Sequence, residues 1–196
     1  MSHHIYKTEA IVLSGFNVGE SNRFLHIFTK ELGLVGASAQ GIRELKSKLK
    51  YSLQDFSYSK VDLVKGKDVW RIVNADQIYS FDELVKNESK KKVFLNIISL
   101  IKRLLVGQLS NEQMWQEVYS GFCFLKNTNL TKKELQFFEV IMVLKILNHL
   151  GYWGESKELD FFVENKIWNT ETLNKMNEFY KDTIRKINNA LAQSHL

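Results

Sequence analysis

The first 79 residues combine short apolar runs with glycine-containing breaks, a pattern typical of β-strands. Three short runs are rich in β-branched and aromatic residues. Two longer runs follow them and flank a connection of hairpin length, Lys65-Gly66-Lys67-Asp68. The predicted strands are 10–13, 23–28, 34–39, 56–64 and 69–78. Five strands in about 70 residues suit a small β-barrel.

After Tyr79 the spacing of apolar residues becomes helical. A serine or threonine followed three residues later by Glu or Gln can cap a helix N-terminus, and this signature occurs at 80–83, 110–113 and 131–134. Helical apolar stripes cover 93–105, 114–122, 134–150 and 173–191. The run 134–150 is apolar nearly all round, so we expect it to form a buried centre. The sequence therefore predicts an α+β chain with a barrel at 1–80 and an all-α domain at 81–196.

Composition places the chain among ordinary globular proteins, with 44% hydrophobic and 25% charged residues. Its single cysteine, Cys123, excludes an internal disulfide and is expected to be a small buried apolar residue. The most apolar stretch, 140–150, is interrupted by Lys145 and is too short to cross a membrane. Since the N-terminus also lacks an apolar targeting segment, we expect a cytoplasmic protein without membrane contact.

Motifs that would indicate catalysis are absent from the sequence. The glycine-containing run 36–41 lacks the G-K-[ST] ending of a phosphate-binding loop. There is no G-x-S-x-G, no H-E-x-x-H and no paired-cysteine pattern, and the histidines are not at ligand spacing. Glu158, Asp160 and Glu164 stand in polar surroundings, where a solvated face is expected. We therefore expect no enzyme, no cofactor and no metal.

Positive charge is concentrated in one part of the chain. The chain has 27 Lys and Arg against 22 Asp and Glu, and residues 41–71 alone hold eight basic and four acidic residues. Cations on a loop of a rigid barrel suit backbone phosphates, and Tyr51, Tyr58 and Trp70 are candidates for stacking on bases. Lysine-rich loops are also commonly just solvated, and such aromatics often belong to a core, so composition leaves both interpretations open. The candidate nucleic-acid-binding residues are Arg23, Arg43, Lys46, Lys48, Lys50, Lys65, Lys67 and Arg71.

Four short runs occur in a specific order: T-E-A-I-V-L at 8–13, V-G-E-S-N-R-F at 18–24, F-T-K-E-L-G-L-V at 28–35 and G-x-R-x-x-x-S-x-L-K at 41–50. Together they resemble the N-terminal domain of the RecO family of recombination mediators. A thinner similarity follows in the helical part, where Phe138-Glu139 leads to Leu150-Gly151-Tyr152. That segment resembles the family's central helix, which ends in L-G-Y.

The resemblance implies an OB-fold barrel that binds single- and double-stranded DNA, anneals strands and, with RecR, helps RecA to replace single-strand-binding protein. It implies no active site. It also implies a cationic groove on the helical domain for the acidic tail of single-strand-binding protein, with Lys102 and Arg103 as candidates. Many members carry a four-cysteine zinc module, but 153–166 contains no cysteine, so we expect that region to be held by packing instead.

Two other functions remain open at this stage. An RNA-binding OB-fold module would prefer RNA over DNA of the same sequence, since OB folds accept either polymer. A protein-interaction adaptor with an incidental basic loop would show no salt-sensitive binding to nucleic acid. Lys102 and Arg103 could likewise belong to a solvated helix face.

Overall fold

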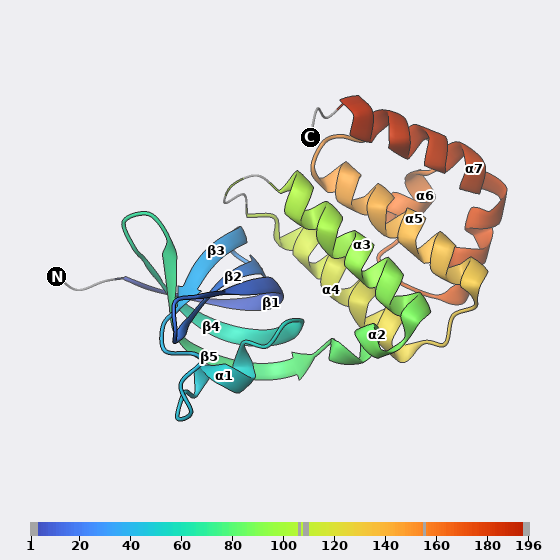
Figure 1. Cartoon of the computed structure of the whole chain (residues 1–196). Coiled ribbons are helices and arrows are strands. Elements are labelled where there is room, and N and C mark those ends of the chain that lie inside the picture. Colours follow the sequence, from blue (N-terminus) through green and yellow to red (C-terminus); the bar gives the residue numbers. More distant parts are fainter. Residues whose placement is uncertain (1–3, 106, 108–109, 155, 194–196) are drawn as a thin grey trace. The chain divides into compact units, whose positions relative to one another are not determined.

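The computed structural model describes residues 4–105, 107, 110–154 and 156–193 (Figure 1). Two compact units divide the chain. One contains the described residues of Met1–Glu83 and Leu105–Glu112, and the other those of Leu84–Leu104 and Gln113–Leu196.

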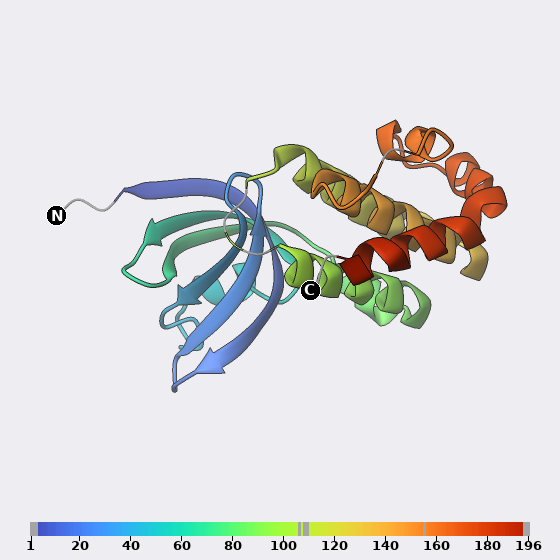
Figure 2. The same cartoon turned by 90° about the horizontal axis from the view of Figure 1, so that it is seen from above.

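The first unit is a closed five-stranded barrel. Its strands are β1 (Ile5–Val18), β2 (Asn22–Thr29), β3 (Gly33–Ala39), β4 (Ser57–Lys65) and β5 (Trp70–Ser80), in the order β1-β2-β3-β5-β4. β3 and β5 pair in parallel, and the other neighbours are antiparallel. The predicted OB-fold barrel followed by helices is confirmed. β1 is much longer than the predicted 10–13, because it curves along two neighbours, β2 and β4, and its polar ends also pair (Figure 2).

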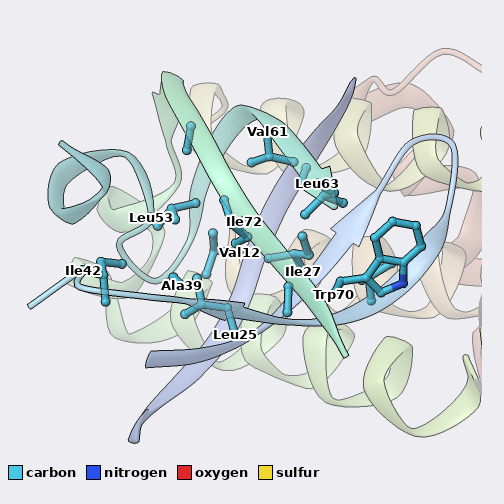
Figure 3. Close-up of a cluster of buried hydrophobic side chains, with 14 residues drawn as sticks. Val12, Leu25, Ile27, Ala39, Ile42, Leu53, Val61, Leu63, Trp70 and Ile72 are labelled. Atoms are coloured by element: carbon cyan, nitrogen blue, oxygen red, sulfur yellow. The ribbon is translucent and has the colours of Figure 1, made fainter. Parts of the chain in front are cut away.

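Side chains that alternate along the strands fill the barrel. Small residues of β1 and β3 leave room for larger ones of β2, β4 and β5, and Figure 3 shows Ile42 and Leu53 at one end of the cluster and Trp70 at the other. Ile42 and Leu53 belong to the β3–β4 connection, which carries the short helix α1 (Leu49–Ser52). The barrel core therefore fixes both ends of this connection.

The second unit is built around α5 (Lys132–His149), which lies between α3 (Glu88–Leu104) and α7 (Thr170–Gln193) (Figure 1). Its other helices are α2 (Asp82–Lys86), α4 (Glu112–Asn127) and α6 (Asp160–Glu164). Ten residues of α5 are buried, so the predicted central helix is confirmed. The expected helix after residue 80 is broken at Asn87, whose side-chain oxygen accepts hydrogen bonds from the amides of Ser89 and Lys90 and so starts α3.

The predicted cap at 131–134 is present. The Glu134 amide donates to Thr131 Oγ1 at 3.3 Å, and the Thr131 amide donates to Glu134 Oε2 at 2.8 Å. The hydrogen bond from the Thr131 amide favours the ionised form of the Glu134 carboxyl group and so lowers its pKa. α5 therefore begins where the sequence predicted.

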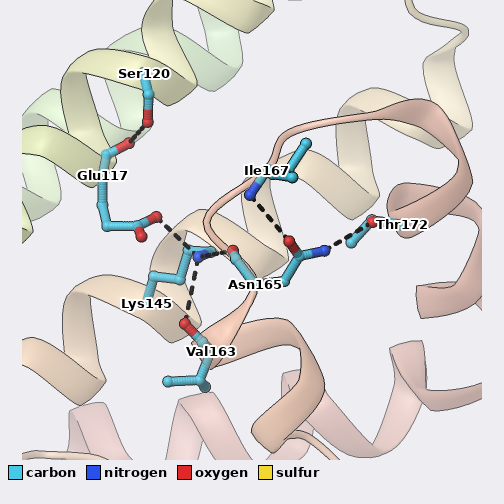
Figure 4. A network of polar contacts seen from close by, with 7 residues as sticks. All are labelled: Glu117, Ser120, Lys145, Val163, Asn165, Ile167 and Thr172. Atoms are coloured by element: carbon cyan, nitrogen blue, oxygen red, sulfur yellow. Dashed lines mark hydrogen bonds and ion pairs between the residues drawn. The ribbon is translucent and has the colours of Figure 1, made fainter.

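A buried lysine holds the segment after α6 (Figure 4). Lys145 Nζ donates to the carbonyls of Val163 at 3.3 Å and Asn165 at 2.6 Å, and lies 2.8 Å from Glu117 Oε2. The contact with Glu117 is an ion pair whose geometry is not that of a hydrogen bond. The expected packing is present in 153–166, where Leu159 and Phe162 are buried, and the Lys145 side chain also ties the segment to α5.

Two other side chains bear on predictions made from the sequence. Cys123 is only partly buried, because it lies beside the inward face of α4 that carries Phe122, and desolvation raises the pKa of its thiol. Burial lowers the pKa of His149, at the end of α5.

Within the described ranges, no cluster of three His, Cys, Asp or Glu side chains could hold a metal, and no helix is both long and apolar enough to span a membrane.

Candidate nucleic-acid interface

The basic connection between β3 and β4 is tied to the barrel at its start. The Gly41 amide donates to Asn22 Oδ1, and the Arg43 amide donates to the carbonyl of Ser21, both at 2.9 Å. Gly41 has φ of 63°, a left-handed conformation that favours glycine. With Ile42 buried between them, these contacts fix where the following cations leave the barrel.

Three of the predicted residues lie together. Arg23, Arg43 and Lys50 line a hollow of about 250 Å³ with Ile42 and Gln54. Arg43 Nη1 donates to the carbonyl of Gly19 at 3.1 Å, which orients its guanidinium.

Arg23 differs from the other predicted cations. Its Nη2 lies 2.9 Å from Asp55 Oδ1, and its side chain is 17% exposed. The carboxylate therefore offsets much of the Arg23 charge, and the pair ties β2 to the residues that precede β4. Across the described part of the chain, the other seven predicted cations form no ion pair, so their charge is available to a ligand.

The structure separates these seven cations into two groups. Arg43, Lys46, Lys48 and Lys50 belong to the β3–β4 connection, which we call the basic connection. The second group belongs to β5 and the hairpin that precedes it and consists of Lys65, Lys67 and Arg71. Since β5 starts beside Ala37 and the connection leaves β3 after Ala39, the groups lie toward opposite ends of the β3–β5 pair. All except Lys50, which is half-buried, are exposed.

Two of the aromatic candidates are not available for stacking. Trp70 is only 4% exposed in the barrel core, and Tyr58 is buried, with its hydroxyl donating to Glu9 Oε2 at 2.6 Å. The prediction that these two rings could stack on bases is therefore wrong, because strand alternation turns Trp70 inward. Tyr51, on α1, is 72% exposed.

Sequence reasoning missed other aromatic residues on the barrel's outer surface. Phe16 of β1 lies beside Phe24 of β2, and His26 follows on the same face of β2. The signal that could have found them is the i, i+2 spacing of Phe24 and His26 within a predicted strand.

The helical unit contains a separate groove of about 400 Å³ between α3, α5 and α7. Its lining includes the apolar side chains of Val93, Leu135 and Ile184 and the cations Lys92 and Lys132. The predicted partner-binding residues Lys102 and Arg103 are exposed in the last turn of α3 but do not line this groove.

Residues 1–81, which include the whole barrel, match the family model described as Recombination protein O N terminal. The barrel is a RecO N-terminal domain. The resemblance inferred from the ordered motifs is therefore confirmed. The basic connection and the hairpin cations both belong to this RecO domain.

Similarity to RecO proteins extends beyond the barrel. The chain is 28% identical over 155 residues to DNA repair protein RecO of Dehalococcoides mccartyi, which covers 79% of the chain and 60% of that relative. It is 31% identical over 156 residues to DNA repair protein RecO of Thermodesulfovibrio yellowstonii, which covers 78% of the chain and 60% of that relative. It is 32% identical over 154 residues to DNA repair protein RecO of Alkaliphilus metalliredigens, which covers 75% of the chain and 58% of that relative. The chain spans about three fifths of the length of the curated relatives it matches.

Proposed function

We propose that this chain is a cytoplasmic mediator of recombinational DNA repair. It binds single- and double-stranded DNA, anneals complementary strands and, with RecR, helps RecA to replace single-strand-binding protein. Its contribution is binding and positioning, with no catalytic group and no cofactor. The observation that carries the proposal is a RecO N-terminal domain whose basic connection presents cations that form no ion pair with a carboxylate among the described residues.

Electrostatics provides the physical basis for this activity. Each lysine or arginine that meets a phosphate releases condensed counterions, so affinity depends on salt but not on sequence. The basic connection is suited to this contact because its ends are fixed by Ile42 and Leu53 while Lys46 and Lys48 are exposed and Lys50 is half-exposed. A binder of this kind can hold either strand of a duplex or a single strand, as annealing requires.

The first prediction concerns salt. Affinity for a labelled single strand should fall with rising salt, with a log-log slope of about −2 to −4 if roughly three to five phosphates are neutralised. Replacing Arg43, Lys46, Lys48 and Lys50 together by alanine should reduce the magnitude of that slope by about 0.7 for each phosphate that is no longer neutralised. Fluorescence anisotropy over a salt series would measure both slopes.

A matched variant removes the same charge elsewhere. Alanine at Lys133, Lys157, Lys166 and Lys181, all exposed on the helical unit, should leave the slope within about 0.7 of the native value. An equal reduction in the magnitude of the salt slope in both variants would show that net charge, rather than the basic connection, holds the strand. A flat slope for the native chain, or clear preference for RNA of the same sequence, would contradict the repair function.

For the protein partner, we propose that the groove of the helical unit receives the acidic, apolar-ended tail of single-strand-binding protein. Its floor offers Val93, Leu135 and Ile184 to an apolar end, and Lys92 and Lys132 complement acidic residues. This arrangement favours Lys92 and Lys132 over Lys102 and Arg103 as the contacting cations. The partnership with RecR rests on the family resemblance.

The second prediction tests this groove. A double variant with alanine at Lys92 and Lys132 should weaken binding of a labelled tail peptide by about three- to tenfold, because two partly exposed charge pairs can no longer form. The matched variant carries alanine at Lys102 and Arg103 and should bind as the native chain does. If the second variant alone loses affinity, the tail lies at the end of α3 instead.

A further inference from the structure

A β-bulge turns two side chains of β1 to the outside of the barrel. The pairing of β1 with β2 shifts between Val12 and Ser14, so that Leu13 is the extra residue. Val12 points into the barrel core, yet Ser14 and Phe16 both lie on the outer face. Without the shift, strict alternation from Val12 would turn Phe16 inward.

The strand register then places a row of side chains across four strands. Phe16 pairs with Phe24, Phe24 with Ser38, and Ser38 with Arg71. Neighbouring strands are about 4.8 Å apart, so Phe16 and Arg71 lie about 14 Å from each other along the row. The row starts with aromatic rings and ends with a cation.

A second row lies beside the first. His26 pairs with Ser14 on one side and with Gly36 on the other. The ring centroids of Phe24 and His26 are 5.5 Å apart, and those of Phe16 and Phe24 are 5.3 Å apart with an interplanar angle of 30°. We call Phe16, Phe24 and His26 the aromatic platform.

Gly36 provides the space in which the central ring lies. A Cβ atom at this position would be 2.7 Å from Cζ of Phe24, so a larger residue would displace the ring. Phe24 therefore lies over the backbone of β3 at Gly36.

The exposure of Phe16 is the unexplained feature of this face. A cross-strand aromatic pair accounts for the Phe16–Phe24 contact. It does not account for the 54% of the Phe16 surface that remains in contact with water. An open ring beside a second ring, in register with an exposed arginine, has the composition of a site that binds a flat, apolar group attached to an anion.

We infer that the aromatic platform stacks on unpaired nucleic-acid bases while Arg71 holds a phosphate of the same strand. The inference rests on the proposed function and adds a second mode of binding to it. Aromatic faces accept any base, so this contact does not depend on sequence. In a duplex the base faces are already stacked, so the platform contributes to single-strand affinity only.

Phe16→Ala is the decisive variant, because this side chain is largely exposed and its removal leaves the barrel core intact. We expect affinity of the full chain for a labelled oligothymidine to fall by about 5- to 150-fold, the range for one stacked base. Affinity for a duplex of equal length should stay within twofold. Phe16→Trp should restore single-strand binding, since its ring can also stack.

Ile78→Ala is the matched control, since Ile78 is another apolar side chain about half exposed on the barrel. It should bind both DNAs as the native chain does, and thermal unfolding should show that each variant is folded. Equal single-strand affinity of Phe16→Ala and the native chain would overturn the platform while leaving salt-dependent DNA binding, and hence the proposed function, in place. Failure of the native chain to bind either DNA would overturn both.

Discussion

Lys145→Met is expected to lower the free energy of unfolding of the helical unit by about 3 to 5 kcal/mol. The Lys145 side chain is 3% exposed, so its removal leaves the Glu117 carboxylate without its cation. The carbonyls of Val163 and Asn165 also lose their donor. Urea denaturation followed by circular dichroism would measure the change.

Two further variants isolate the cause. Lys186→Met removes a lysine whose ion pair with Asp182 is much more exposed than the Lys145–Glu117 pair. It should lower the free energy of unfolding by less than about 1 kcal/mol. Replacing Lys145 and Glu117 together by methionine should recover much of the stability, because no buried charge is left unpaired. A cost below about 1 kcal/mol for Lys145→Met would mean that water reaches the pair.

Trp70→Ala should destabilise the barrel by about 3 to 5 kcal/mol, the range for removing a large aromatic side chain from a core. Trp70 closes one end of the cluster of Figure 3, and its ring lies 5.1 Å from that of Tyr6. Trp70→Phe should cost much less. It keeps a ring in place and removes an indole N–H that has no hydrogen-bond partner within the described residues. Thermal and urea unfolding would measure both.

Tyr51→Ala is the matched exposed substitution and should change the free energy of unfolding by no more than about 0.5 kcal/mol. The comparison separates an aromatic residue of the barrel core from an exposed one on the same barrel. If Trp70→Ala kept native stability but lost DNA affinity, Trp70 would be a ligand-binding residue after all.

The sequence by itself determined the order and type of the five strands and of the long helices, whereas the short helices α1 and α6 were not predicted. Alternation and turn residues indicated the strands, because a half-buried strand must change face at every residue. The apolar run 134–150 and the cap at Thr131 marked the central helix, since both depend on residues close in the chain. The same local motifs indicated the RecO domain, and the basic connection is visible as a run of charge.

Only the tertiary structure decided which side chains reach solvent and which meet. The bulge at Leu13 depends on pairing with β2 and turns Phe16 outward, whereas Trp70 turns inward. Lys145 looked like an interruption of an apolar helix, yet its backbone partners follow 18 and 20 residues later. Arg23 meets Asp55 across 32 residues. These contacts join residues distant in the chain, and local periodicity carries no information about such distances.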